Sequence, residues 1–586
     1  MPLTIYTSNR MEALVEQLCA VVEPPLSSPF VPETIVVQSR GMERWLAMEL
    51  AKRLGIWANG SYPFPNAFVW SLFRAALPHL PDQSPFDPAI LTWRIMDLLP
   101  RLLPEPAFGQ LRGYLAGEDR ELRLYQLAAR IADTFDQYTV FRGDLLTAWE
   151  TGRDQQWQAR LWRALTADSP GTHRGAVRDA FLKQLAGGRL PAGVCPERVS
   201  VFGISYLPPF HLEIFTSLAR LCPVNLFVLS PCREYWGDIV SPGARARMTP
   251  ERRQQAVEGH PLLASLGKPG RDFSSLILAC DDLSGGERDL YAEAPGETLL
   301  AAVQNGILTL DEADGTPRLV RVDPGDRSIG IHSCHGPMRE AEVLHDVLLA
   351  MFEELPDLTP RDIIVMTPDI ETYAPYVAAV FGGGQDQQRR RIPFSIADRS
   401  IRCAGGAADT FLAILDLPLG RFPVTDVLDI LETGAVHRRF GIDEAGLEQI
   451  RSWVEATRIR WGMDENERRA AGLPAYRENS WQAGLDRLLL GVAMPDEEGA
   501  MFGGILPHDA MEGDGPVLLG RFIRFVEALD RVRRDLVRPR SLEGWTATLR
   551  GILADFFNPD DATALERAAV GRIVDGLGEL GAGSGF

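Results

Sequence analysis

Lysine is the scarcest charged residue of this 586-residue chain. Only three of the 60 basic residues are lysines, at Lys52, Lys183 and Lys268. A P-loop needs the sequence Gly-Lys-Ser/Thr, because the lysine contacts the β- and γ-phosphates and the hydroxyl group binds magnesium. Only Lys268 follows a glycine, and Pro269 stands where the hydroxyl residue is needed. The chain therefore has no Walker A motif, and we expect it to have no ATP site.

Other catalytic signatures are missing too. A metal-dependent nuclease motif of the (Asp/Glu)-x-Lys type needs an acid two positions before its lysine, but Leu50, Phe181 and Leu266 occupy those positions. No His-Glu-x-x-His and no complete Gly-x-Ser-x-Gly occurs. We interpret His332 and Cys334 as polar residues at a strand end, since a closed zinc site needs four convergent ligands. We expect no catalytic residues, no metal site and no cofactor in this chain.

Cysteine pairs and long apolar runs are also absent. The seven cysteines are scattered without a Cys-x-x-Cys pair, which is typical of reduced thiols in a cytoplasmic protein. The first residues carry no charged segment followed by an apolar run, so we predict no signal peptide. No stretch of about 18 apolar residues exists that could span a membrane. We therefore predict a cytoplasmic protein without membrane contact.

The net charge of −19 argues against binding nucleic acid through the global field of the protein, but it allows a local basic channel. Arginine forks suit phosphate oxygens and stack on bases. We interpret each arginine cluster, considered by itself, as a solvated face whose arginines pair with nearby aspartates. DNA contact is the alternative. One cluster comprises Arg389, Arg390, Arg391, Arg399 and Arg402 around Phe394, and the other Arg531, Arg533, Arg534, Arg538 and Arg540.

Short β-branched runs alternate with helical patterns and predict an α/β fold. Several runs are almost continuously apolar, as strands buried on both faces of a parallel sheet must be. Helical periodicity follows two of them, over 41–50 and 339–351, and strand–helix alternation is typical of α/β layers. The predicted strands are 3–6, 34–38, 199–204, 224–229, 329–334 and 362–366.

Two regions have helical patterns without strand signals. Residues from about 75 to 195 include apolar helical spacing at 90–103 and 122–138, which predicts a helical insertion in the first α/β domain. A second helical region runs from about 405 to the end. Between 231 and 325 the chain is rich in loop residues and reads as a long connection into a second α/β unit.

Seven blocks of sequence, in order along the chain, resemble the RecC family, the gamma subunit of exodeoxyribonuclease V in the RecBCD helicase–nuclease. The blocks cover residues 37–45 (VQSRGMERW), 132–138 (ADTFDQY), 231–238 (PCREYWGD), 260–272 (HPLLASLGKPGRD), 334–346 (CHGPMREAEVLHD), 358–366 (LTPRDIIVM) and 459–462 (IRWG).

The resemblance implies two superfamily 1 helicase-like (RecA-like) domains without an ATP site. We expect domain 1 at 1–325, the first part of domain 2 at 326–430, and a helical insertion of domain 2 at 431–586. Family members are roughly twice as long, so we expect the second domain to be incomplete and the chain to be a fragment or a split gene product.

The resemblance also implies a function. A RecC-like subunit has no catalysis of its own and assembles with RecB-like and RecD-like subunits, which use ATP and magnesium. It splits duplex ends, guides the single strands and recognises a Chi hotspot during double-strand break repair by homologous recombination. Two alternatives remain open: an autonomous but degenerate helicase or nuclease, and an interaction scaffold without DNA contact.

The family's Chi-reading positions place the candidate DNA-binding residues. Arg40, Arg44, Phe64 and Thr134 stand where the family pattern has Thr, Gln, Leu and Leu, so the resemblance does not predict which hotspot sequence is read. Asp133 and Asp136 lack metal partners, and the residues alone predict a capping role, an arginine pair or acceptance from a cytosine amino group. The candidate residues are Gln38, Arg40, Arg44, Phe64, Trp70, Asp133, Thr134, Asp136, Arg142 and Arg174.

Overall fold

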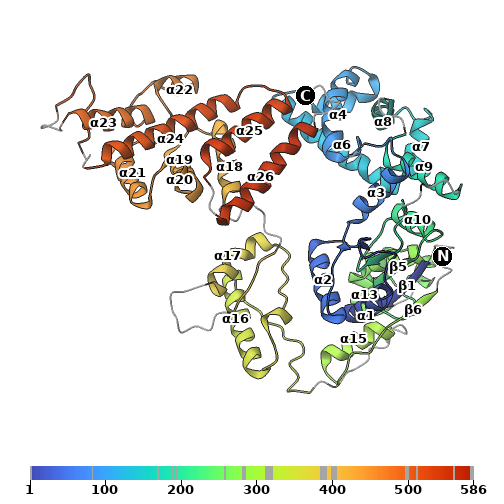
Figure 1. The fold of residues 1–586 in the computed structure, drawn as a ribbon. Helices are drawn as coiled ribbons and strands as arrows, with labels where there is room; N and C mark the ends of the chain where they lie inside the picture. The colour runs from blue at the N-terminus through green and yellow to red at the C-terminus, as the bar shows by residue number, and fades with distance from the viewer. Residues whose placement is uncertain are drawn as a thin grey trace. The chain divides into compact units, whose positions relative to one another are not determined.

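The chain forms two compact units, Met1–Ile331 and His332–Phe586, and each is described by itself (Figure 1). The boundaries expected near 325 and 430 stay predictions. The computed structural model describes residues 3–81, 83–167, 171–187, 191, 194–255, 259–279, 286–310, 321, 323–382, 392–397, 406–494, 500–509, 513–558 and 561–580.

The first unit is built on a six-stranded sheet in which every pairing is parallel, in the order β3-β2-β4-β5-β1-β6. The four predicted strands of this unit are its four central strands, which confirms the α/β class. The two edge strands carry no apolar pattern, and they were not predicted. The strands are β1 (Leu3–Ser8), β2 (Glu33–Val36), β3 (Gly60–Ser61), β4 (Val199–Phe202), β5 (Val224–Leu229) and β6 (Glu287–Asp289).

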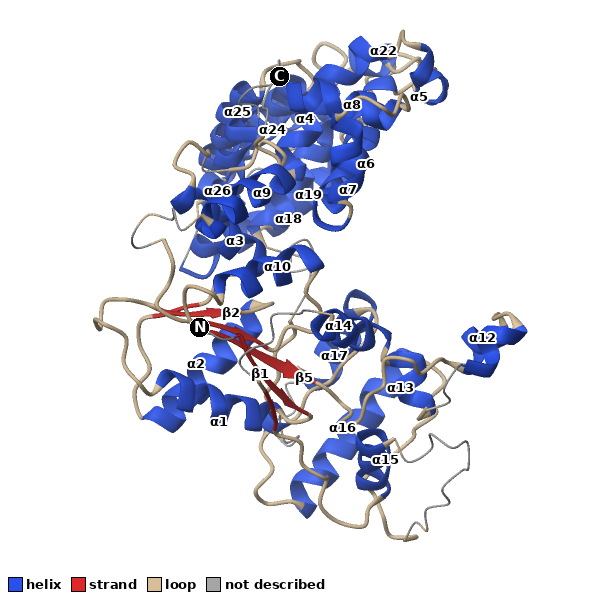
Figure 2. Cartoon of the chain, turned by 90° about the vertical axis from the view of Figure 1, so that its right-hand side faces the viewer, coloured by secondary structure: helices blue, strands red, loops and turns tan. Residues whose placement is uncertain are grey.

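Helices cover both faces of this sheet (Figure 2). Successive residues of β2 alternate between the two faces. Ile35 and Val37 pack with α1 (Met11–Val22) and α2 (Arg40–Leu54). Val36 joins the opposite core, formed with α3 (Pro65–Ala76), α9 (Arg174–Ala186) and α10 (Pro209–Leu218). Burial on both faces explains why the central strands are almost continuously apolar.

A helical region follows α3 and has its own core. No strand occurs between Ser61 and Val199 in the part of the chain that the structure describes. The helices predicted at 90–103 and 122–138 are confirmed as α4 and α6, which pack against each other. Trp162 is fully buried at the centre of this core. The main helices are α4 (Pro88–Leu102), α6 (Arg120–Phe141), α7 (Gly143–Glu150) and α8 (Trp157–Ala167), with the shorter α5 (Gly109–Tyr114) between α4 and α6.

Within its described residues, the segment predicted as loop-rich, 231–325, contains five helices besides the edge strand β6. Trp236 and Leu263 form a small core beneath them. The helices are α11 (Pro242–Ala246), α12 (Pro250–Gln255), α13 (Pro261–Leu266), α14 (Lys268–Leu278) and α15 (Leu299–Thr309).

The predicted strands at 329–334 and 362–366 are wrong. Both segments lack strand hydrogen bonding, and most of their apolar side chains are open to solvent, with Ile331 93% and Ile364 80% exposed. An apolar β-branched run forms a strand only beside a partner strand that takes its backbone hydrogen bonds. The helices that follow these segments, α16 (Pro337–Glu354) and α17 (Ile370–Phe381), pack against each other.

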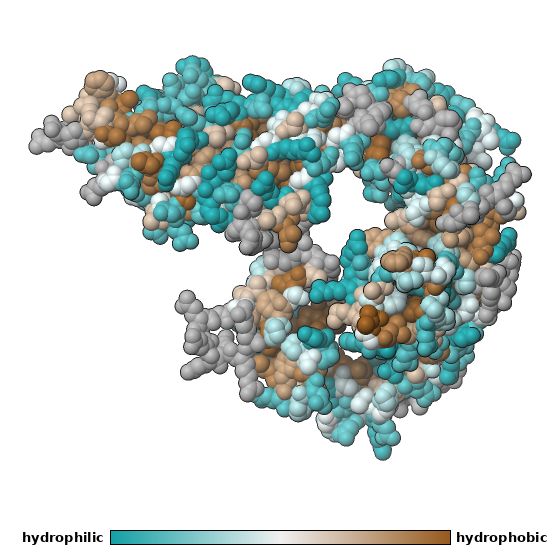
Figure 3. Space-filling view, viewed as in Figure 1, coloured by the Kyte–Doolittle hydropathy of each residue, from teal (hydrophilic) through white to brown (hydrophobic). Residues whose placement is uncertain are grey.

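The rest of the second unit is helical, with a core that includes Trp453, Trp481 and Phe522. Hydrophilic residues cover most of its outward surface in the view of Figure 3, with apolar side chains between them. Its helices are α18 (Ala407–Asp416), α19 (Val424–Glu432), α20 (Gly434–Phe440), α21 (Glu444–Thr457), α22 (Glu465–Ala470), α23 (Trp481–Ala493), α24 (Gly515–Leu536), α25 (Leu542–Phe556) and α26 (Asp561–Leu580).

Candidate nucleic-acid interface

Gln38 lies just beyond the carboxyl end of β2, where the chain turns into α2. Its side-chain oxygen accepts a hydrogen bond from the backbone N–H of Ser205, which follows the carboxyl end of β4, at 3.4 Å. Ser39 caps α2 by accepting from the N–H of Met42 at 3.1 Å. In open α/β sheets, ligands bind at the carboxyl ends of the strands. The exposed Gln38 therefore occupies the edge of the sheet where a ligand is expected.

Three further candidates gather at the start of α2. The guanidinium of Arg40 lies 5.5 Å from the ring centre of Phe64 and pairs with Glu43 at 2.6 Å. The Arg40 side chain is 79% exposed. Phe64 is the N-cap residue of α3 and is itself partly exposed. Arg44 is exposed one turn along α2 from Arg40. A helix N-terminus attracts anions, so these two arginines add to a field that already favours phosphate.

The remaining candidates lie on or beside α6. Asp133 is exposed and accepts a hydrogen bond from Gln137 at 3.2 Å, with Arg130 at 3.5 Å. The hydroxyl group of Thr134 donates to the carbonyl of Arg130 at 2.8 Å, so the helix itself already satisfies that donor. Both contacts are weak or local, which leaves the outer face of α6 open to a ligand.

Asp136 and Arg174 form an ion pair between α6 and the first residue of α9. Their Oδ1 and Nη1 atoms are 2.9 Å apart, and both atoms are buried in a geometry that does not make a hydrogen bond. Burial raises the pKa of Asp136, and the nearby Arg174 lowers it only in part. The arginine pair was one of the open interpretations of this aspartate, and the structure confirms it.

Arg142 and Trp70 complete the set. Arg142 ends α6 with a half-exposed side chain, 3.8 Å from Asp144. Trp70 packs partly buried against the sheet core, edge-on to Phe73 at 6.4 Å between ring centres. Helix α3 carries Phe64 at its start and Trp70 near its middle, and it packs against α9 and α10. One helix thus links the residues beside α2 with those beside α6 and α9.

Two histidines support this region, and the sequence patterns did not indicate them. His173 caps α9, because its Nδ1 accepts from the N–H of Ala176 at 3.3 Å while Nε2 lies 2.9 Å from Glu150. Burial lowers its pKa, which keeps the ring neutral and Nδ1 free to accept. Histidine is not among the usual capping residues, so this cap had no sequence signal. It fixes the start of α9, and with it Arg174.

His211, on α10, is the second supporting histidine. Its Nε2 donates to the side-chain oxygen of Asn66 on α3 at 2.9 Å. Burial lowers the pKa of His211 to about 4, and the charge of Arg174 adds to this shift. The neutral ring therefore joins α10 to α3 without placing a second positive charge beside Arg174.

The pH dependence of stability tests this burial of His211. Between its pKa of about 4 in the folded chain and about 6.5 in the unfolded chain, only the unfolded chain binds the proton. Stability is therefore expected to fall as the pH drops through this range, by about 3 kcal/mol from this residue alone. Urea unfolding of the wild type and of His211→Gln between pH 7 and 4.5 measures the difference. Equal slopes for both proteins contradict the prediction.

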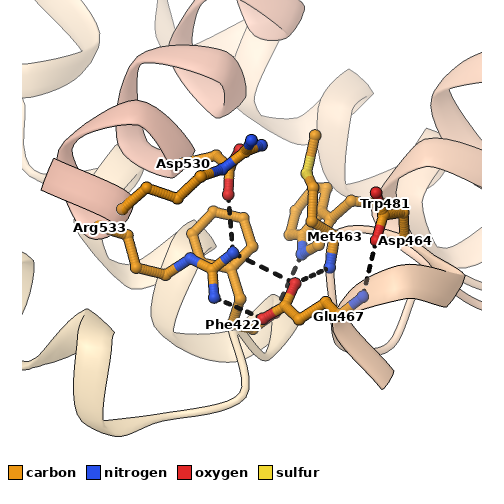
Figure 4. A network of polar contacts seen from close by, with 8 residues as sticks. Phe422, Met463, Asp464, Glu467, Trp481, Asp530 and Arg533 are labelled. Carbon is orange, nitrogen blue, oxygen red and sulfur yellow. Dashed lines mark hydrogen bonds and ion pairs between the residues drawn. The ribbon is translucent and has the colours of Figure 1, made fainter. Parts of the chain in front are cut away.

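Four arginines in and just after α24 pair with carboxylates, and Figure 4 shows the network around Arg533. Arg533 pairs with Asp530 at 2.7 Å and with Glu467 of α22, and its guanidinium lies 5.0 Å from the ring centre of Phe422. Arg534 pairs with the same buried Asp530. Arg538 and Arg540 pair with Asp535. The expected pairing with aspartates is confirmed at these four positions, but the expected solvated face is found only at Arg534 and Arg538, because Arg533 and Arg540 are mostly buried.

The other arginine cluster, Arg389, Arg390, Arg391, Arg399 and Arg402, lies outside the described residues. Its aromatic neighbour Phe394 is described and lies edge-on to Phe381, 5.8 Å between ring centres. Within the described ranges, no group of three or more His, Cys, Asp or Glu side chains is placed to hold a metal ion. No helix in those ranges is both long enough and apolar enough to cross a membrane.

Comparison with known proteins matches both units. The family model "RecC, N-terminal domain" matches residues 3–310, and "RecBCD enzyme subunit RecC fourth domain" matches residues 405–586. The RecBCD enzyme subunit RecC of Escherichia coli (strain K12) is 38% identical over 629 aligned positions, which cover 98% of this chain and 56% of that protein. The subunit of the same name from Haemophilus influenzae is 34% identical, covering 96% of this chain and 54% of its own length.

A third relative, the RecBCD enzyme subunit RecC of Mycolicibacterium smegmatis, is also 34% identical, over 94% of this chain and 51% of its own length. The chain thus spans about half the length of the curated relatives it matches. Because the N-terminal family model alone covers more than half of the residues, the chain belongs to the RecC family.

Proposed function

We propose that this chain is a DNA-binding, scaffolding subunit of a RecBCD-type ATP-dependent helicase–nuclease that acts in double-strand break repair by homologous recombination. In this role it splits duplex ends, guides the single strands and recognises a Chi-like hotspot. The observation that carries the proposal is the exposed set of Arg40, Arg44 and Phe64 around the N-terminus of α2, beside the carboxyl ends of the sheet strands. The names of the relatives agree with it.

The proposal includes a fold of two RecA-like helicase domains without an ATP site. The parallel sheet of the first unit, with helices on both faces, supports the first domain. For the second domain the support is the pair α16 and α17, each preceded by an extended apolar segment without a partner strand.

The ten candidate residues divide into two roles in this proposal. Arg40 and Arg44 attract phosphates, Phe64 stacks on an unpaired base, and Gln38 offers hydrogen bonds to a base edge. Asp133, Thr134, Asp136, Arg142 and Arg174 contact bases farther along the strand, beside Trp70. The ion pair between Asp136 and Arg174 must break before either residue can bind a base, because each side chain is already bound to the other.

The proposed partners are RecB-like and RecD-like subunits, which bind ATP and magnesium, together with duplex ends and single-stranded DNA. Co-expression with these two subunits, followed by affinity purification through this chain, tests the assembly. A stable heterotrimer is expected. Recovery of this chain without either partner, while a full-length RecC in parallel recovers both, would overturn the scaffolding role.

Replacing Arg40 and Arg44 together by alanine is expected to weaken single-stranded DNA binding about tenfold or more at low salt. Each lost phosphate contact also reduces the slope of log K against log salt by about 0.7. Filter binding across a salt series measures both effects. Arg53→Ala is the matched control, because Arg53 lies at the far end of the same helix and pairs with Glu49. Equal affinities for all three proteins refute DNA contact at this site.

Two rival functions make different predictions. An autonomous but degenerate helicase or nuclease degrades or unwinds DNA without partners, whereas the proposed subunit shows neither activity when it is purified alone. An interaction scaffold without DNA contact assembles with its partners but gives no salt-dependent DNA binding in any assembly state. The three lysines, all outside catalytic motifs, favour the non-catalytic subunit.

A further inference from the structure

Cys195 and Cys222 stand at the amino ends of two neighbouring strands. Cys195 lies four residues before β4, and Cys222 lies two residues before β5. The strands are parallel, with Val199 opposite Val224, and the N–H of Val199 donates to the carbonyl of Pro223 at 3.0 Å. The register thus brings the two thiols to the same end of the sheet.

The thiol groups of Cys195 and Cys222 lie close enough for each to shift the pKa of the other. Cys222 is buried in the core between the sheet and α10, and the half-buried Cys195 packs against the same core. Both thiols are free. The chain is anchored beside both residues, because the N–H of Cys222 donates to Leu218 at 3.2 Å and Arg198 binds Glu33. Two thiols in contact can be joined without a large backbone movement.

The pair has a built-in division of roles. The neighbouring Cys222 thiol lowers the pKa of Cys195 below its usual value. The Cys195 thiol, together with burial, raises the pKa of Cys222. The thiolate is the reactive form of cysteine, so Cys195, which is also the more exposed of the two, is the nucleophile. Cys222 is then placed to attack the oxidised sulfur.

Two other described cysteines lack this arrangement. Burial raises the pKa of Cys232 to about 11, and its thiol donates to backbone carbonyls at 3.5 Å. Burial also raises the pKa of Cys19. Both thiols are therefore poorer nucleophiles at neutral pH than Cys195.

We propose that Cys195 and Cys222 form an oxidisable pair that hydrogen peroxide converts into an intramolecular disulfide between the amino ends of β4 and β5. The Cys195 thiolate attacks one peroxide oxygen, the O–O bond breaks, and hydroxide leaves with the other oxygen, giving a sulfenic acid. The Cys222 sulfur, losing its proton, then displaces the hydroxyl group from the Cys195 sulfur. Two thiols and one peroxide become one disulfide and two water molecules.

The position of this disulfide predicts its consequence. Gln38 and Ser205 lie beyond the carboxyl ends of the strands, at the opposite edge of the sheet from the two cysteines. Oxidation therefore leaves the candidate DNA-binding surface in place. Because it closes the chain between two adjacent strands, it restricts the unfolded state and stabilises the first unit. The inference is independent of the proposed function.

The test exposes the full-length, reduced protein to hydrogen peroxide and maps its peptides without reduction. A peptide joining Cys195 to Cys222 is expected, with the loss of two hydrogen atoms and a higher midpoint of thermal unfolding. Brief alkylation of the reduced protein is expected to label Cys195 about tenfold faster than Cys232. In Cys222→Ser, the sulfenic acid on Cys195 persists and is trapped by dimedone, whereas Cys195→Ser traps none at Cys222.

Cys334→Ser is the matched control, because Cys334 is another half-buried free thiol and belongs to the second unit. This variant should form the Cys195–Cys222 disulfide as the wild type does. The proposal is overturned if Cys195 is alkylated no faster than Cys232, or if peroxide produces no peptide that joins Cys195 to Cys222.

Discussion

Arg198→Ala is expected to lower the free energy of unfolding of the first unit by about 3–5 kcal/mol, the usual cost of breaking a buried ion pair from one side. Arg198 donates to both carboxylate oxygens of Glu33, at 2.9 and 2.6 Å, and the two side chains are only 11% and 9% exposed. It also donates to the carbonyls of Val21 and Pro24. One side chain thus holds together the end of α1, the start of β2 and the entry to β4.

The expected loss of stability is large because the Glu33 carboxylate stays in place when Arg198 is removed. Without Arg198, the Glu33 carboxylate remains buried and unpaired, together with the backbone carbonyls that the guanidinium had satisfied. Chemical denaturation followed by tryptophan fluorescence measures the change. Arg101→Ala is the control, because Arg101 pairs with Asp97 at 2.7 Å but is 68% exposed. Its expected loss is about 0–1 kcal/mol. Similar losses for both variants would show that the Arg198 site is not a buried pair.

Arg533→Ala is expected to destabilise the second unit by about 3–5 kcal/mol and to leave DNA affinity unchanged. Arg533 neutralises the buried Asp530 and also binds Glu467. Glu467 in turn accepts a hydrogen bond from the N–H of Met463 at 2.7 Å, so the loop before α22 depends on the same network (Figure 4). Removing the guanidinium leaves Glu467 without its arginine and leaves the buried Asp530 with Arg534 as its remaining partner.

Arg531 supplies the matched control on the same helix. Its side chain is exposed, so Arg531→Ala is expected to change stability by no more than about 0.5 kcal/mol. Thermal unfolding and filter binding on the same preparations separate the two roles. If Arg533→Ala unfolds at the wild-type temperature but binds DNA more weakly, the network is dispensable and this helix face is a DNA contact.

In the first unit, the apolar pattern of the sequence predicted the central strands of the sheet but not its edge strands. The four central strands were predicted because both of their faces are buried, which demands a nearly continuous apolar sequence. The edge strands β3 and β6 were missed because an edge needs only one ladder of hydrogen bonds. In β6 that ladder is made by exposed Glu287, Arg288 and Asp289, against β1. The backbone supplies those bonds whatever the side chains are.

The second unit shows the opposite failure. Residues 329–334 and 362–366 have the composition of buried strands, yet the structure leaves Ile331 and Ile364 exposed and unpaired. A segment becomes a strand only when a second segment pairs with its backbone, and the composition of the first segment does not show whether that partner is present. The helix pattern at 339–351, which follows the first of these segments, was predicted correctly and lies within α16, because a helix satisfies its hydrogen bonds within a single segment.

The sequence by itself determined what depends on composition and local order. Three lysines in the wrong contexts exclude a P-loop, periodicity predicts the main helices and the central strands, and ordered motifs identify the family. Only the tertiary structure decided which arginines are available. Arg40 and Arg44 remain exposed, whereas Arg174 and Arg533 are held by Asp136 and Glu467 from other helices. The reason is physical: a local pair such as Arg40 with Glu43 can be read from the spacing of the residues, whereas the partners Asp136 and Glu467 lie 38 and 66 residues away and reach their arginines only through folding.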